Sequence, residues 1–424
     1  MTLSERDKKH LWHPLTQHKI NPDHLAIASA KGAVFTDEKG KDYVDGIASW
    51  YTSMYGHCNP YITARMKDQL ERLDHVIFSG LTHEPAVKLS ELLVEILPEG
   101  QEKLFFSDNG STSVEVAIKM SLQYHFNRGE HRNTIVAFDN GFHGDTFGAM
   151  SVSGLSVYNG PFEDFFLRVE RIPVPDGRNN EAVIDRFKAF LSSGKVASFI
   201  FEPLVQGAAG MKMYDAAPLE QLMEIASAHG VLNIADEVMT GFGKTGTLFA
   251  SDQLRIKPDM ICLSKALTAG MLPMAATSCT KEVYNAFLSD DLGKGFFHGH
   301  TYTANPLACA AAIAGIELLR SEDMQENISR IRSLHRDFEA RISPSPLVKN
   351  TRRLGVIFAF ELDIEMERYG NLRQKLYDHF MAHGAFLRPL GNTIYILAPY
   401  VTTNEQMEVL YSAIEAVLDK GGAL

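Results

Sequence analysis

The spacing of apolar and polar positions alternates between helical and strand-like segments over much of the chain. Apolar residues recur at helical spacing at about 60–74, 83–97 and 112–128. Short apolar runs bounded by Gly, Asp and Pro favour buried strands, and they lie at 104–106, 134–138, 198–201, 231–235 and 260–263. Such runs are typical of a parallel sheet. The alternation therefore predicts an α/β fold, with a large, mostly parallel sheet that carries helices on both faces.

The pattern changes in the last quarter of the chain. Residues 305–343 show helical periodicity, 355–362 and 393–399 favour strands, and 403–419 favours a closing helix. This part therefore predicts a smaller α+β unit. Strand candidates at 34–35 and 43–44 lie before the large domain, and we expect them to join the smaller unit. The expected division is an N-terminal segment at 1–54, a large domain at 55–310 and a small domain at 311–424.

Composition narrows the functional classes. The chain has 424 residues, 45% hydrophobic content and a net charge of -11, without a Lys/Arg-rich run, so nucleic-acid binding is not expected. Its charged opening lacks the apolar stretch of a signal peptide, and no apolar run reaches membrane-spanning length, so we expect a cytoplasmic protein without a membrane partner. Its four scattered cysteines contain no CxxC pair, which favours reduced thiols, and no metal site is expected.

Candidate chemistry lies where polar residues follow the predicted strands. Ligands of parallel α/β sheets bind beyond the carboxyl ends of the strands. Four polar groups occupy such positions, and we expect them to face a common site: Asn109-Gly110-Ser111, Glu202, Asp236 and Lys265.

Each of these groups also has an ordinary structural interpretation. The Gly-Ser turn before a helix suits a phosphate, but it also suits a simple helix cap. Asp236 at a strand end needs a cationic partner, which a salt bridge would supply as well as a protonated pyridine. Lys265 is either a nucleophile with a lowered pKa or a side chain that reaches solvent. Together, a phosphate cradle, an acid and a lysine are the groups needed to hold a phosphorylated pyridine aldehyde.

The motifs that contain these residues occur in the order known from one enzyme family. Asn109-Gly110-Ser111, Gly141-Phe142-His143-Gly144, the segment 234–238 and Leu263-Ser264-Lys265 resemble the class III aminotransferases of fold type I. The resemblance covers essentially the whole chain. It implies a pyridoxal 5'-phosphate (PLP)-dependent transferase fold of type I, in which Lys265 binds the cofactor as a Schiff base and Asp236 pairs with the pyridine nitrogen.

The same resemblance implies the other site residues. Gly110 and Ser111 would hold the phosphate, and Thr301 would reach it from the partner subunit, so a homodimer with shared active sites is expected. Phe142 would cover the ring face, with His143 and His300 also at the cofactor. The substrates would be a small-molecule amino donor and a keto acceptor, bound by residues that include Phe142 and Lys265 and also Leu15, Trp50, Gly299 and Arg388.

Arg388 has a physical argument of its own. The planar fork of an arginine can bind both oxygens of a substrate carboxylate, and the following Pro389 favours a constrained backbone. The alternative is a surface ion pair. Glu202 is either a hydrogen-bonding or gating partner near Arg388 or part of a structural salt bridge.

A second set of motifs is similar to a subgroup of this family. The segments 11–14, 49–50 with 56–57, 142–149 and 305–312 look like those of its biotin-pathway members. That similarity implies amination of 8-amino-7-oxononanoate to 7,8-diaminononanoate, with S-adenosylmethionine as the typical donor and lysine in some members. An ω-amino acid aminotransferase, an aminomutase and a non-catalytic cofactor-binding protein are the alternatives.

Four positions depart from that subgroup. Leu15 and Phe142 stand where members often carry tyrosine, Lys244 stands where arginine is common, and His300 replaces a proline of some members. A lost hydroxyl without a stranded partner shifts binding by about 1 kcal/mol, so the reaction class is unaffected. These positions leave the choice between the two donors open.

Overall fold

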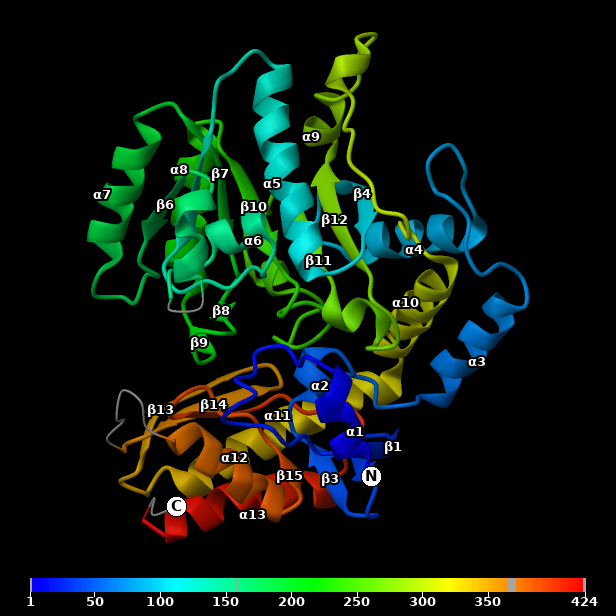
Figure 1. Cartoon of the computed structure of the whole chain (residues 1–424). Coiled ribbons are helices and arrows are strands. Elements are labelled where there is room, and N and C mark those ends of the chain that lie inside the picture. The colour runs from blue at the N-terminus through cyan, green and yellow to red at the C-terminus, as the bar shows by residue number, and fades with distance from the viewer. Residues whose placement is uncertain (1, 157–158, 365–370, 422–424) are drawn as a thin grey trace.

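A seven-stranded sheet forms the centre of the larger unit in the computed structural model, which describes residues 2–156, 159–364 and 371–421 (Figure 1). Strand β12 is antiparallel to both of its neighbours, and the other six strands share one direction. The order across the sheet is β4 (Gln101–Ser107), β12 (Ala275–Thr280), β11 (Met260–Leu263), β10 (Leu232–Asp236), β7 (Val196–Phe201), β5 (Thr134–Phe138) and β6 (Val169–Ile172). The predicted α/β class, with a mostly parallel sheet, is confirmed.

Two of these strands were not predicted from the apolar runs. Strand β12 has the sequence Ala-Ala-Thr-Ser-Cys-Thr, whose small and polar side chains are buried although they form no apolar run. Strand β6 reads Val-Glu-Arg-Ile and lies at the edge of the sheet, where polar side chains are tolerated. Pairing with neighbouring strands, rather than hydrophobicity, makes both segments extended.

Side-chain alternation divides the core into two layers. Ile135, Ala137 and Ile200 belong to the cluster on the side of α5 (Gly110–Asn127). Their neighbours along the strands, including Val136, Phe138, Phe199 and Phe201, face the opposite layer, which contains α7 (Asn180–Leu191) and α8 (Ala216–Ala228). Because successive residues of a strand point to opposite faces, helices cover both faces of the sheet (Figure 1).

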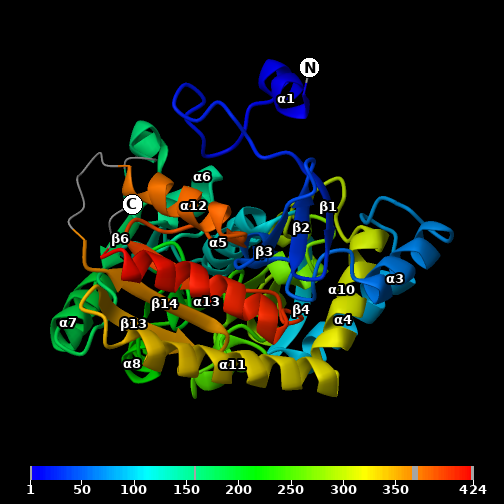
Figure 2. The same cartoon turned by 90° about the horizontal axis from the view of Figure 1, so that it is seen from below.

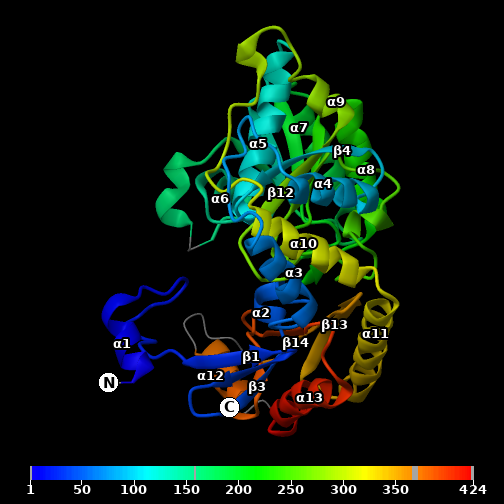
Figure 3. The ribbon, with the colours of Figure 1, turned by 90° about the vertical axis from the view of Figure 1, so that its right-hand side faces the viewer.

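The smaller unit combines the two ends of the chain. Its antiparallel sheet contains β13 (Val348–Leu354), β14 (Ile357–Leu362) and β16 (Thr393–Ile396), with α11 (Glu322–Ile342), α12 (Leu372–Ala382) and α13 (Asn404–Asp419) beside it (Figure 3). A second sheet has the order β1 (Ile27–Lys31), β2 (Val34–Asp37), β3 (Asp42–Asp45) and β15 (Ala385–Phe386). Ala385 lies opposite Val44 in parallel register, so N-terminal and C-terminal strands share this sheet.

Helix α10 (Pro306–Leu319) links the two units. It packs against α3 (Pro60–Leu70), α4 (Glu84–Ile96) and the 3-10 helix η3 (Lys265–Thr268). The division expected at 310/311 therefore falls within a continuous helix, whose periodicity does not change there. In the described part of the chain, no helix is both long and apolar enough to cross a membrane.

Short elements complete the chain. They are α1 (Leu3–His10), α2 (Ala48–Tyr51), α6 (Phe147–Val152), α9 (Lys281–Asn285), β8 (Val205–Gln206), β9 (Lys212–Met213), η1 (Gly160–Phe165), η2 (Ala250–Gln253) and η4 (Leu292–Lys294).

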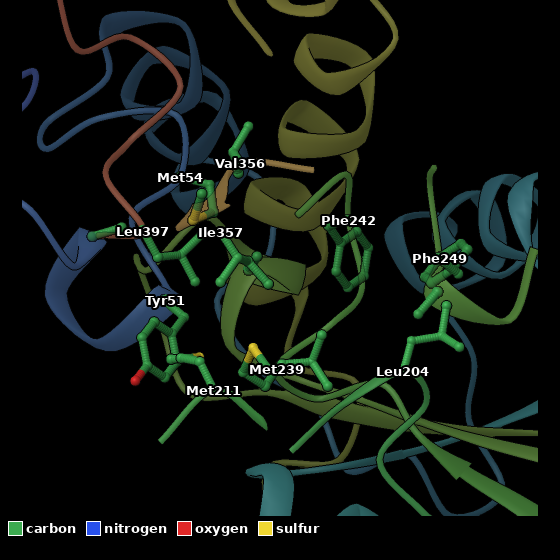
Figure 4. Packing of buried hydrophobic residues seen from close by; sticks show 14 of the residues in the cluster. Tyr51, Met54, Leu204, Met211, Met239, Phe242, Phe249, Val356, Ile357 and Leu397 are labelled. Atoms are coloured by element: carbon green, nitrogen blue, oxygen red, sulfur yellow. The ribbon is translucent and has the colours of Figure 1, made fainter. Parts of the chain in front are cut away.

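Buried apolar side chains connect the two units behind the carboxyl edge of the large sheet. Figure 4 shows Met239 and Phe242 of the larger unit close to Ile357 of the smaller one, with Tyr51 beside them. Each of these side chains is at least 95% buried. Burial of a Phe or Leu side chain contributes about 1.5–3 kcal/mol, so this contact fixes the smaller unit against the strand ends.

Candidate active site

Four of the parallel strands deliver polar groups to one edge of the large sheet. Asp236 is the last residue of β10, Lys265 follows β11, Glu202 follows β7, and α5 begins at Gly110 just after β4. Because these strands run in the same direction, their carboxyl ends lie on the edge that faces the smaller unit (Figure 1). The structure thus brings together the four groups that the sequence singled out.

Asp236 is buried and paired with a histidine. Its Oδ2 lies 2.6 Å from Nδ1 of His143, and its Oδ1 accepts the amide of Val238 at 3.1 Å. Burial lowers the pKa of His143, but the hydrogen bond to Asp236 and its charge raise that pKa more, so the net shift is upward. The pair holds the carboxylate in a fixed orientation at the strand end.

Lys265 is held in a strained backbone conformation. Its φ is +46°, in the left-handed region that residues with a Cβ rarely adopt. Burial lowers the pKa of its ammonium group, although the charges of Asp236 and Glu202 oppose that shift. A lowered pKa increases the neutral, nucleophilic fraction of the amine, so this lysine differs from one that reaches solvent.

The start of α5 provides a cradle that requires close backbone approach. A Cβ on Gly110 would lie 2.8 Å from Val238 Cγ1, and one on Gly144 would lie 2.1 Å from Ser111 Oγ. The Ser111 hydroxyl accepts the amide of Asp145 at 3.2 Å. Asn109 caps the helix through the amide of Thr112, so the capping interpretation also holds. The positive end of this 18-residue helix remains suited to a phosphate.

Glu202 orients the segment that carries Phe142. Its Oε1 accepts the amide of Phe142 at 2.9 Å, and its Oε2 accepts the amide of Gly207 at 2.9 Å. Burial raises the pKa of Glu202 to about 7. Its carboxylate partners in the described chain are thus two backbone amides, rather than Arg388 or the cation of a structural salt bridge.

A left-handed turn presents two aromatic side chains. The four residues of α2 all have positive φ, between +45° and +72°. Trp50 is 45% exposed, and its ring stacks with Arg388, whose Cζ lies 5.3 Å from the ring centroid. Tyr51 is buried, with its ring centroid 5.3 Å from Lys265 Nζ and its hydroxyl donating to Tyr395 at 2.9 Å. The sequence analysis did not predict Tyr51 as a site residue, although its position next to Trp50 in the sequence indicated that it lies near the site.

Lys244 is a second buried lysine near the site. Its Nζ donates to the carbonyl of Gly241 at 2.9 Å. Burial lowers the pKa of Lys244 to about 7, and the charge of Lys265 contributes in the same direction.

Three of the remaining expected site residues are exposed, and the fourth, His300, is partly buried. Leu15 is 67% exposed on the N-terminal segment, which projects from the body (Figure 2). Gly299 and Thr301 are exposed. His300 is partly buried, with its Nε2 3.0 Å from His298 Nε2 and its Nδ1 3.5 Å from Asp108 Oδ2. One chain therefore does not enclose these residues.

The sheet topology and the groups at its carboxyl edge define a PLP-dependent transferase of fold type I. A buried carboxylate, a lysine with a lowered pKa and a helix N-terminus lined by glycines fit the ring nitrogen, aldehyde and phosphate of PLP. The cofactor of this protein is PLP.

The chain belongs to the class-III aminotransferase family, whose sequence model matches residues 16–418. It is 44% identical over 422 residues to the adenosylmethionine-8-amino-7-oxononanoate aminotransferase of Synechococcus elongatus, covering 97% of this chain and 99% of that protein. The structure of the enzyme of that name from Methanocaldococcus jannaschii matches with a TM-score of 0.91 and 32% identity, over 98% of both chains. The omega transaminase of Pseudomonas jessenii, solved in complex with PMP, matches with a TM-score of 0.91 and 26% identity, over 100% of both chains.

Proposed function

We propose that this aminotransferase transfers an amino group to 8-amino-7-oxononanoate and forms 7,8-diaminononanoate, a step of biotin biosynthesis. The observation that carries the proposal is the 44% identity, over nearly the whole of both chains, to a relative named for this acceptor. We take S-adenosylmethionine as the donor because the relative's name includes it, with lysine as the alternative. The cytoplasm is the proposed compartment, consistent with four cysteines that are all free thiols.

Lys265 is the proposed catalytic base and acid. When bound, PLP supplies an electron sink for the electrons left at a carbon that loses its proton. The Lys265 amine lies at the end of β11 beside Asp236, and burial favours its neutral form. In that form it can accept a proton from the donor carbon and return it at the neighbouring position.

Asp236 would hold the ring nitrogen protonated. Its charge is buried beside His143, where a nearby cation is favoured much more than it would be in water. Gly110 and Ser111 would bind the phosphate, and the ring of Phe142, oriented through Glu202, would cover the cofactor. His143 contributes by fixing the orientation of the Asp236 carboxylate.

Arg388 is the proposed clamp for the acceptor carboxylate. Its guanidinium stacks on Trp50, which leaves the planar fork available for two parallel hydrogen bonds. Leu15 and Gly299 would complete the wall of the substrate site. Their exposure in one chain favours a second subunit beside them.

We further propose a homodimer in which Thr301 reaches the phosphate region of the partner's site, with His300 also at a cofactor. Thr301 is exposed, and the same segment carries Phe297 and Tyr302 with 78% and 62% of their surfaces exposed. Neighbouring large apolar side chains of this kind are typical of a protein interface.

The test is a pair of half-reactions with the purified PLP-bound enzyme. S-adenosylmethionine or lysine is added while the visible absorbance of the cofactor is followed, and 8-amino-7-oxononanoate is added afterwards. The proposal predicts that one donor bleaches the band and that the ketone restores it. If a donor bleaches the band but the ketone does not restore it, the proposed acceptor is wrong. The chain would still be an aminotransferase.

A further inference from the structure

The N-terminal segment contains a cluster of histidine and aspartate side chains outside the site described above. Asp7 lies on α1, and His13 and His24 lie on the chain that follows it. Each offers one potential ligand atom, and these three atoms lie within 4.8 Å of one another. His13 Nε2 is 3.0 and 2.8 Å from the two carboxylate oxygens of Asp7.

This segment is folded without an apolar core. Helix α1 buries no residue, and within one chain the apolar side chains near it are exposed, with Trp12 90% exposed and Leu15 67% exposed. The cluster residues are instead partly buried. Small folded segments that lack a hydrophobic core are commonly stabilised by a disulfide or a metal ion. The four cysteines lie elsewhere, at 58, 262, 279 and 309.

His24 is the residue that an ordinary hydrogen-bonded cluster does not explain. Its Nε2 is buried and has no hydrogen-bond partner among the described residues. Its ring centroid lies only 3.7 Å from that of His13. A buried polar atom without a partner destabilises the fold, and a bonded ligand would offset that cost.

We propose that Asp7, His13 and His24 form a binding site for a first-row divalent cation, above all zinc. Two imidazoles and one carboxylate are a common zinc ligand set, and water would fill the fourth position. In a tetrahedral zinc site the ligand atoms lie roughly 3.4 Å apart, as follows from bonds of about 2.0–2.1 Å. The Asp7–His13 pair is already closer than this, and the His24 ligand atom lies within 4.8 Å of both, so binding would draw His24 toward the pair.

Binding would tie α1 to the chain that carries Leu15. The backbone amide of His13 donates to His18 Nε2 at 3.0 Å, and this bond lies within the loop that connects the ligands His13 and His24. A cation at the cluster would therefore order residues 7–24 as one unit. This inference does not depend on the proposed acceptor, because it concerns binding by the folded chain.

The direct test is zinc titration of untagged, PLP-bound enzyme that has been treated with a chelator and freed of excess cofactor. The expected result is one zinc ion per chain, with affinity at least about 10-fold weaker in His24→Ala and Asp7→Asn because each loses a ligand. His10→Ala is the matched control, since His10 is exposed on the same helix and lies outside the cluster of Asp7, His13 and His24. Cobalt in place of zinc should add a visible absorption band that reports tetrahedral ligands.

Limited proteolysis supplies a readout independent of affinity. Zinc should slow cleavage between residues 11 and 24 in the native enzyme and in His10→Ala, but not in His24→Ala. Equal zinc affinity in His24→Ala and His10→Ala, or the absence of stoichiometric binding to the native enzyme, would overturn the proposal.

Discussion

The site has an inner half that binds the cofactor and an outer half that binds the substrates. One chain supplies more of the residues of the inner half than of the outer half. Asp236 and His143 are at least 96% buried and joined by a 2.6 Å hydrogen bond, with Lys265 at the adjacent strand end. Leu15 and Gly299, which we place in the wall of the substrate site, are exposed. The groups that fit the ring nitrogen and the aldehyde of PLP are therefore organised within one chain, whereas one chain leaves the proposed substrate wall open.

The largest expected effect comes from the inner half. Lys265→Ala should lower turnover by about 10³-fold or more, because it removes the proposed nucleophile and proton carrier together. The fold should persist, since Lys265 lies at a strand end and contributes little to the core. Steady-state rates and thermal unfolding measure the two effects separately. Activity near that of the native enzyme would remove Lys265 from the mechanism.

Asp236→Asn should lower the rate by roughly 10²–10³-fold, as losses of a single preorganised electrostatic group do. Asparagine keeps the size of the side chain and a hydrogen bond to His143 but loses the charge that favours a protonated ring nitrogen. Single-turnover rates at saturating PLP isolate the chemical step. If only cofactor affinity changed, Asp236 would be a binding residue without an electrostatic role.

Arg388→Ala tests the substrate wall and should raise the KM for the keto acceptor by about 10–100-fold, with a smaller change in kcat. It removes charge-assisted hydrogen bonds worth about 1.5–3 kcal/mol that last through the reaction. Arg373→Ala is the matched control, because Arg373 is exposed on α12. If the KM for the acceptor is unchanged and equal in Arg388→Ala and Arg373→Ala, the acceptor carboxylate does not bind to Arg388.

Thr301→Ala addresses the shared site and should weaken PLP binding by about 10-fold, the effect of losing a hydrogen bond to a charged group. A second experiment mixes this variant with Lys265→Ala. Subunit exchange should create one site that has both intact residues, so PLP affinity and turnover should partly recover. No recovery after proven exchange would mean that Thr301 serves its own chain's site or none.

Glu202→Gln should have the smallest effect on rate but a distinctive effect on stability. Burial raises the pKa of Glu202 to about 7, above its ordinary value of 4.5. Between these values the folded state keeps a proton that the unfolded state has lost, so the free energy of unfolding falls as the pH rises through this window. The free energy of unfolding should fall by about 3 kcal/mol in the native enzyme, and this fall should be absent in Glu202→Gln.

Denaturant unfolding of the native enzyme and Glu202→Gln from pH 4.5 to 8 measures this difference. Subtracting the two curves removes contributions from other titrating groups. A flat difference curve would show that folding does not raise the pKa of Glu202, because the amides of Phe142 and Gly207 offset its burial.

Sequence reasoning worked best where local pattern and chemistry agree. The parallel strands were recognisable from continuous apolar runs, and Asp236 and Lys265 follow such runs directly. It worked least well for β12, whose small polar side chains form no apolar run, and for Tyr51, whose place beside Lys265 depends on a left-handed turn. Glu202 was singled out by its position, but its partners, two backbone amides, could not be read from residue types.

The sequence by itself determined the α/β class, the family and the order of the chemical groups along the chain, because these depend on short-range periodicity and on contiguous motifs. Only the tertiary structure decided which groups meet. It paired His143 with Asp236, stacked Arg388 on Trp50 and gathered Asp7, His13 and His24, all across sequence separations that no local rule relates. Such contacts depend on the packing of whole elements, which the residue pattern constrains but does not specify.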